Sequence, residues 1–161
     1  MIIDTHAHYD DKAFDEDRNE VLNTLKDHEV GLVVNVGASM QTTRNTMKLI
    51  EQYDFVYGAV GVHPDETGEL QDVDMNELEE YAKHKKVVAI GEIGLDYYWD
   101  SVERDIQKKW FKILEIFEQI GRYGCFFCMM FNISGTYFGF SSNFSFRIYL
   151  IIYVSNRRRL L

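Results

Sequence analysis

Proline is nearly absent from this chain of 161 residues, which contains one, and cysteine occurs only twice. With so little proline and no low-complexity tract, the chain is not disordered over most of its length. Cys125 and Cys128 form one C-x-x-C pair, and no second pair or nearby histidine completes a zinc or redox motif. Because Asp4 and His6 come before the apolar core of a signal peptide could form, no secretory signal is predicted and the expected compartment is the reducing cytoplasm.

Residues 113–161 lack lysine, aspartate and histidine altogether, and their only acidic residues are Glu115 and Glu118. This segment has a net charge of +3, against −12 for residues 1–112 and −9 for the whole chain. The acidic first segment repels a phosphate backbone, so no stable complex with nucleic acid held by charge alone is expected. We therefore divide the chain into two segments of different character, 1–112 and 113–161.

Four strand signals alternate with helix signals in the first segment. The strands are expected in apolar or β-branched runs, at residues 1–3, 30–36, 55–62 and 86–90. Their starts recur about every 30 residues, the length of a βαβ unit. The residues alone are compatible with an α/β fold of either kind, a doubly wound parallel sheet or part of a (β/α)8 barrel. The glycine-rich loop that usually follows the first strand of a doubly wound nucleotide fold is replaced here by H-A-H-Y.

Apolar residues at helical spacing predict the intervening helices. The expected N-cap residues of the first three are Asp15, Ser39 and Asp74. The fourth helix is expected to carry Ile106, Trp110 and Phe111 on one side.

Two histidines follow the first strand signal. Asp4, His6 and His8 are spaced two residues apart, so in extended backbone they project from one face. Neutral imidazole offers a lone pair near pH 7, and two rings about 6–7 Å apart along a strand can converge on one divalent ion. This pattern predicts a metal site, and the competing interpretation is ordinary polar residues at a strand end.

Glu92 and His63 follow two later strand signals. Glu92 precedes Gly94, where the backbone turns, and its carboxylate is suited to bridging metal ions or holding a water for attack. The alternative is a solvated loop carboxylate. Pro64 biases His63 toward extended backbone, where it would contact substrate or metal or serve a structural role.

Four motifs together resemble a known family. They are D-T-H-A-H at 4–8, G-V-H-P at 61–64, G-E-I-G-L-D-Y at 91–97 and E-R-D-I-Q-K-K-W-F at 103–111. In this order they resemble the TatD-like metal-dependent hydrolases and deoxyribonucleases, over about residues 1–112. The resemblance implies a TIM-type barrel of roughly 250 residues, of which this segment supplies the first four βα units. It also implies one or two divalent metal ions and hydrolysis of phosphodiester bonds in DNA.

Position by position, the resemblance makes His6 and His8 first-strand metal ligands and Glu92 the carboxylate ligand after the fourth strand. His63 and Asp96 lie in family motifs near that site, close to substrate, with no ligand role implied. The family has two further histidine ligands and an aspartate on later strands, and residues 113–161 contain neither residue type. The expected function is therefore that of a TatD-like hydrolase using a metal-activated water, in a chain that lacks the later ligands. The alternative is a non-catalytic fragment of a damaged or mispredicted hydrolase gene that at most binds metal weakly.

The aromatic-rich second segment is expected to have no family resemblance. A frameshifted or mispredicted reading frame explains its abrupt change of composition. A membrane span over residues 123–146 is the competing interpretation, and Asn132, Asn143 and several serines count against it. Half a barrel leaves two open sheet edges, so self-association is also expected.

Overall fold

The computed structural model describes residues 1–99, 101–120 and 124–127, with residues 115–120 and 124–127 described by their backbone alone. Five strands form one sheet in this part of the chain: β1 (Ile2–Ala7), β2 (Val30–Val36), β3 (Val56–Val60), β4 (Val87–Ile93) and β5 (Gly124–Phe127). The α-helices are α1 (Arg18–Thr24), α2 (Met40–Gln52), α3 (Asp72–Ala82) and α4 (Arg104–Ile120). Short 3₁₀ helices follow β1, α1 and β3: η1 (Lys12–Phe14), η2 (Leu25–His28) and η3 (Pro64–Glu69).

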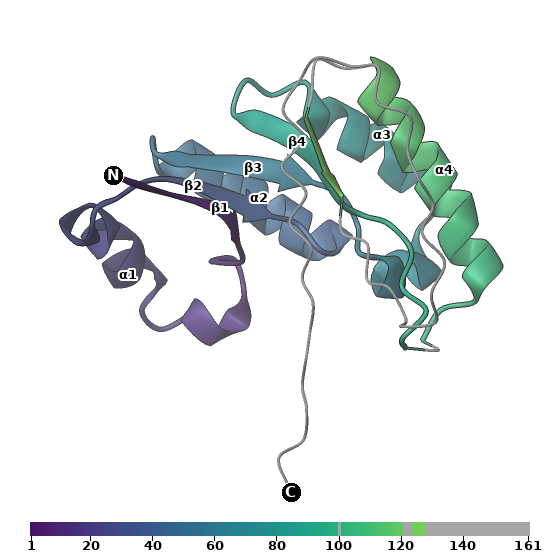
Figure 1. Ribbon diagram of the computed structural model, residues 1–161, viewed down its shortest axis with the longest axis horizontal. Coiled ribbons are helices and arrows are strands. Elements are labelled where there is room, and N and C mark those ends of the chain that lie inside the picture. The colour runs from purple at the N-terminus through teal and green to yellow at the C-terminus, as the bar shows by residue number, and fades with distance from the viewer. Residues whose placement is uncertain (100, 121–123, 128–161) are drawn as a thin grey trace, which may run out of the picture.

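All neighbouring strands pair in parallel, and the sheet order is the chain order, β1-β2-β3-β4-β5. A doubly wound sheet reverses its strand order at a switch point, whereas a barrel adds each strand beside the previous one. The described strands have no reversal, and together they form a curled half-barrel (Figure 1). The expected partial (β/α)8 architecture is therefore confirmed.

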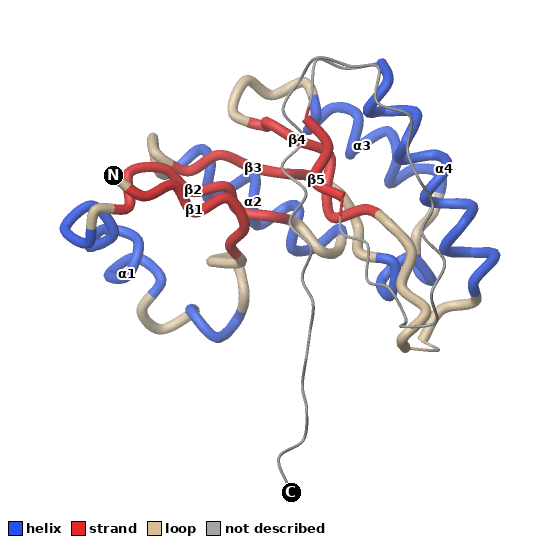
Figure 2. Tube along the Cα trace, viewed as in Figure 1, coloured by secondary structure: helices blue, strands red, loops and turns tan. Residues whose placement is uncertain are grey.

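The sheet has a helix-facing side and an inner side. The main core lies beneath the helices and includes Val33, Val56 and Ile90 together with Leu49 and Ile50 of α2. The opposite side holds a smaller buried cluster, formed by Val36, Ala59 and Ala89. Alternation along each parallel strand produces these two layers, since successive side chains point to opposite faces. Figure 2 shows the strands side by side, with α1 at one end of the sheet and α3 and α4 at the other.

Of the three N-cap residues predicted from the sequence, one is confirmed. Ser39 caps α2 as predicted, and its hydroxyl accepts the Thr42 N–H in a capping box. Asp15 is not the N-cap of α1: that helix starts after Asp17, and the Asp15 carboxylate pairs with Arg18 at 2.6 Å. Asp74 is not an N-cap either, because it occupies the third position of α3 and accepts the Gln71 N–H at 2.9 Å.

The buried face of α4 is confirmed for Trp110 and for Phe111, which packs against the core, but not for Ile106. Ile106 is 38% exposed, whereas Gln107, Trp110 and Leu114 are buried at helical spacing. The Gln107 side chain takes the inner position because its amide bonds the main chain of Asp96, accepting from its N–H and donating to its carbonyl oxygen.

The compositional break at residue 112 lies within α4, and β5 belongs to the second segment. Cys128, the side chain of Cys125 and most of residues 123–146 lie outside what the structure describes. No helix in the described ranges combines the length and the apolar character that crossing a membrane requires.

Candidate metal centre

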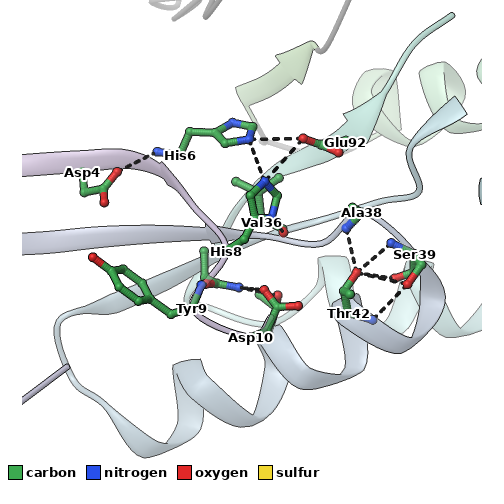
Figure 3. Close-up of polar contacts among 12 residues, drawn as sticks. Asp4, His6, His8, Tyr9, Asp10, Val36, Ala38, Ser39, Thr42 and Glu92 are labelled. Atoms are coloured by element: carbon green, nitrogen blue, oxygen red, sulfur yellow. Dashed lines mark hydrogen bonds and ion pairs between the residues drawn. The ribbon is translucent and has the colours of Figure 1, made fainter. Parts of the chain in front are cut away.

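Three side chains from opposite ends of the described segment meet at the carboxyl edge of the sheet. His6 lies in β1, His8 directly follows it, and Glu92 lies in β4 (Figure 3). His6 Nε2 is 3.1 Å from both His8 Nε2 and Glu92 Oε1, and His8 Nε2 is 3.7 Å from the same oxygen. Within the described residues these three form the one group of histidine, cysteine and acidic side chains able to hold a metal ion. Glu92 was expected just after the fourth strand, and this position is corrected: Glu92 lies inside β4.

These distances suit a cation. Atoms separated by 3.1, 3.1 and 3.7 Å surround a point about 1.9 Å from each, close to the roughly 2.0–2.2 Å of zinc bonds to nitrogen and oxygen. Three protein ligands with an open position are also the pattern of catalytic zinc sites. The group therefore fits a divalent ion.

The orientation of His8 favours the same conclusion. Its Nδ1 lies 2.9 Å from the Val36 carbonyl oxygen, which can only accept, so Nδ1 carries the hydrogen. In the neutral ring, Nε2 then presents a lone pair toward His6 and Glu92 (Figure 3). A carbonyl that fixes the outer ring nitrogen is a usual companion of a metal-ligating histidine.

Glu92 is nearly buried, with 7% of its surface exposed. Burial by itself raises the pKa of its carboxyl group, but the hydrogen bond from His6 and the charges of His63, His8 and His6 outweigh it. The net effect lowers the pKa below the usual glutamate value. The Glu92 carboxylate is thus anionic at neutral pH.

The loop between β2 and α2 holds the main chain of Glu92 and of His63. The Gly37 carbonyl oxygen accepts the N–H of Glu92 at 2.8 Å, and that of Ala38 accepts the N–H of His63 at 2.8 Å. Gly61 must lack a side chain, because a Cβ there would lie 2.5 Å from the Glu92 carbonyl oxygen. Close packing of the Gly61 main chain against the main chain of Gly91 and Glu92 therefore sets the position of Glu92 at the sheet edge.

Asn35 is a positioning residue that the sequence analysis missed. It is fully buried in β2, and its amide donates to Asp10 Oδ1 at 2.7 Å and Thr46 Oγ1 at 2.8 Å. Its carbonyl oxygen accepts the N–H of Tyr9 at 2.7 Å, which secures the chain directly after His8. The signal available in the sequence was an amide in an otherwise apolar strand.

The remaining candidates lie around the group rather than in it. Asp4 accepts the main-chain N–H of His6 at 3.2 Å and is outside the cluster. His63 caps η3, where its Nδ1 accepts the N–H of Asp65 at 3.2 Å. Asp96 is fully buried and also outside the cluster; its Oδ1 accepts the N–H of Tyr98 at 2.7 Å.

Comparisons with known proteins agree with this geometry. The sequence profile described as TatD related DNase matches residues 3–120. The chain is 43% identical over 112 residues to the uncharacterized metal-dependent hydrolase YabD of Bacillus subtilis, covering 70% of this chain and 44% of that protein. It is 32% identical over 84 residues to the 3'-5' ssDNA/RNA exonuclease TatD of Escherichia coli, covering 52% of this chain and 32% of that protein.

A solved structure has the same fold over this part of the chain. It is YjjV, a TatD homologue from Escherichia coli K12, with a TM-score of 0.71 and 26% identity. The match covers 78% of this chain and 49% of YjjV. The chain thus spans less than half the length of the relatives it matches.

Proposed function

The chain belongs to the TatD-related DNase family, and from this membership we propose that it is a metal-dependent hydrolase of phosphodiester bonds in nucleic acid. The observation that carries the proposal is the convergence of His6 Nε2, His8 Nε2 and Glu92 Oε1 on one point. Two relatives described above are named for metal-dependent hydrolysis and for nuclease action on single strands, which agrees with this chemistry.

The proposed ligands divide the work of holding a divalent ion. His6 and His8 contribute neutral nitrogen atoms, and the anionic Glu92 offsets part of the positive charge. When bound, such an ion stabilises negative charge on a phosphoryl oxygen and makes a water acidic enough to attack phosphorus near neutral pH. The Val36 carbonyl keeps the lone pair of His8 directed at the ion position.

His63 is proposed as a hydrogen-bond donor to the substrate rather than a ligand. The Asp65 N–H occupies its Nδ1, so in the neutral ring the hydrogen lies on Nε2. An N–H donor beside a metal site is suited to a non-bridging phosphate oxygen. Asp96 is proposed to act by shaping the loop after β4, through its bonds to Tyr98 and Gln107.

A second candidate function is that of a fragment that binds metal weakly without turnover. The observation that favours it is the ligand count: three groups converge among the described residues, and residues 113–161 contain no histidine or aspartate. Three ligands suffice for one ion, whereas a two-metal site needs more.

We further propose that the substrate is engaged transiently, in a cytoplasmic setting. The net charge of −9 disfavours a lasting complex with a phosphate backbone unless cations intervene. Two cysteines in the whole chain are consistent with a reducing compartment.

Hydrolysis of bis(p-nitrophenyl) phosphate with and without added divalent ions tests the proposal. We expect turnover in the wild type and in His28→Ala, which removes an exposed histidine from η2, outside the ligand cluster. His6→Ala and Glu92→Gln should lose it by at least about 100-fold, because each removes a ligand. If the wild type is no faster than His6→Ala, the chain is not a hydrolase, and calorimetric titration with the same ion then decides whether it binds metal at all.

A further inference from the structure

Two large aromatic side chains are exposed in the loop between β4 and α4. Tyr98 is 64% exposed and Trp99 is 56% exposed. Their rings meet edge to face, with centroids 4.6 Å apart and planes at 86°. Large aromatic rings are mostly buried in folded proteins, so an exposed pair in contact is a candidate surface for a ligand or partner.

The loop that carries this pair is anchored at both ends. The Gln107 side chain bonds the main chain of Asp96 at 2.9 and 2.8 Å, and Asp96 Oδ1 in turn accepts the Tyr98 N–H. On the other side, Ser101 Oγ donates to Asp65 Oδ1 at 2.9 Å, joining the loop to η3, the helix capped by His63. Tyr98 is therefore held through its own main-chain N–H, which lowers the entropy cost of binding.

The pair is also connected to the candidate metal centre by a short length of chain. Trp99 lies seven positions after Glu92, and an extended chain rises at most about 3.3–3.6 Å per residue, so the two lie within about 25 Å. Glu92 lies in β4, and the loop that carries Trp99 follows the carboxyl end of the same strand. A nucleic-acid strand of a few nucleotides spans that distance.

We infer that Tyr98 and Trp99 form a stacking platform for a nucleobase of single-stranded nucleic acid, a few nucleotides from the bond being cut. This inference rests on the proposed function and adds to it a means of recognising the substrate. Aromatic rings stack on every base, which provides affinity without cations. An acidic chain needs such a contribution, because its net charge of −9 opposes binding through phosphates.

One local cation supports a nucleic-acid occupant over an apolar protein surface. The exposed Arg104 guanidinium lies over the Tyr97 ring, 4.7 Å from its centroid, one residue along the chain from Tyr98. A base on the platform would therefore have a positive group close to its phosphate. An aromatic surface with a neighbouring arginine is a common arrangement in proteins that bind single strands.

Trp99 provides the reporter for the test. The chain has two tryptophans, and Trp110 is only 3% exposed, so Trp110→Phe leaves the exposed indole as the one tryptophan signal. The full chain with this substitution is titrated, in the presence of a chelator that prevents hydrolysis, with oligothymidylate and with an abasic oligonucleotide of equal length. We expect saturable fluorescence quenching by oligothymidylate and at least about fivefold weaker binding of the abasic strand, whose phosphates are the same.

Matched variants, followed by anisotropy of a labelled strand, separate stacking from charge. Trp99→Ala and Tyr98→Ala should each weaken oligothymidylate binding at least about fivefold, whereas Tyr98→Phe should restore it. The affinity should change little as salt rises, in contrast to the steep loss of complexes held by phosphate contacts. Equal binding of both strands, or unchanged binding by the alanine variants, overturns the inference. Association of the chain with itself that is lost in Trp99→Ala, measured by sedimentation, would also overturn it and assign the surface to a second copy.

Hydrolysis of bis(p-nitrophenyl) phosphate, which has no nucleobase, distinguishes this inference from the proposed function. The wild type should hydrolyse this ester whether or not the platform binds a base, and Tyr98→Ala and Trp99→Ala are judged by oligothymidylate binding alone. Base-dependent binding without any hydrolysis would support the stacking platform and contradict the proposed function. Hydrolysis without base-dependent binding would support the proposed function and contradict the platform.

Discussion

The Nδ1–H of His8 donates to the Val36 carbonyl oxygen at 2.9 Å, so β2 orients a side chain that follows β1. The bond fixes the ring and assigns its lone pair to Nε2, the atom nearest Glu92 and His6. The candidate ligand from the first strand is therefore set by the second, and the carboxylate completing the group comes from the fourth. The curvature of the sheet brings these three side chains together.

We predict that one divalent ion binds per chain, because three ligand atoms surround one point. An ion at 100 times its dissociation constant stabilises a folded protein by about 2.7 kcal/mol. Thermal unfolding with added ions should therefore show a raised Tm for the wild type and for the control His28→Ala, and no rise for Glu92→Gln. A stoichiometry of two by calorimetry would contradict the single site.

Gly61→Ala should disturb the candidate metal centre without replacing any of its three residues. The added Cβ would lie 2.5 Å from the Glu92 carbonyl oxygen and 2.6 Å from the Gly91 carbonyl carbon, so the main chain of β4 must shift. We expect a loss of about 1–3 kcal/mol in unfolding free energy and a weaker metal affinity. Gly68→Ala is the control, because its Cβ would meet only Val102 side-chain atoms, the nearest at 3.3 Å. Equal metal affinity of the two variants would show that Gly61 does not set the position of Glu92.

Replacing the buried amide of Asn35 should destabilise the fold. Asn35→Leu keeps the approximate volume but leaves Asp10, Thr46 and the Tyr9 N–H without this partner. Unpaired buried polar groups make the expected cost about 2–4 kcal/mol in urea unfolding. The exposed Asn23→Ala should change stability by less than about 0.5 kcal/mol. A neutral Asn35→Leu would mean that the network does not stabilise the fold.

The ion pair between α2 and α3 gives stability a defined dependence on pH. Arg44 Nε and Nη2 donate to the two Glu77 carboxylate oxygens at 2.7 and 2.6 Å, and this hydrogen bonding lowers the pKa of Glu77 despite partial burial. Because the folded pKa lies below the unfolded one, about 4.3, the stabilisation is complete above that value and is lost as pH falls through the folded pKa. Glu77→Gln should therefore lower Tm at pH 7 and lose its difference from the wild type in acid. A constant difference at every pH would exclude the carboxylate as the cause.

The outer edge of β1 is predicted to mediate self-association. Within the described sheet β1 pairs only with β2, and Ile2 and Ile3 are 53% and 50% exposed. Unpaired strand edges with apolar side chains join other chains unless charges prevent it. Sedimentation at increasing concentration should show association that Ile3→Lys suppresses. Val73→Lys, on an exposed position of α3 that is 65% accessible, should not suppress it.

The sequence by itself determined the order of elements and the identity of the candidate ligands. Strand starts expected near residues 1, 30, 55 and 86 lie at 2, 30, 56 and 87. Local signals were strong there, since β-branched runs and helical spacing act over a few residues. The same holds for His6 and His8, whose two-residue spacing already gives them a common face.

Local patterns failed where contacts between distant residues decide the outcome. Asp15 and Asp74 resemble helix caps, yet the Asp15 carboxylate pairs with Arg18 and Asp74 occupies the third position of its helix. No local pattern predicted the burial of Gln107, whose side chain bonds the main chain of Asp96 eleven positions away. The role of Asn35 could not be read from its apolar neighbours in the sequence, because its three partners lie in the loop after β1 and in α2.

Periodicity and spacing thus identified the candidate ligands, because those patterns depend on neighbours along the chain. The choice of a half-barrel was decided by tertiary structure, through the sequential parallel order of the strands. So was the meeting of His6 and His8 with Glu92, more than eighty residues away, since only the curvature of the sheet brings the ends of β1 and β4 together. The cost of ordering distant segments is met by burial of the core beneath the helices, and no local pattern encodes that balance.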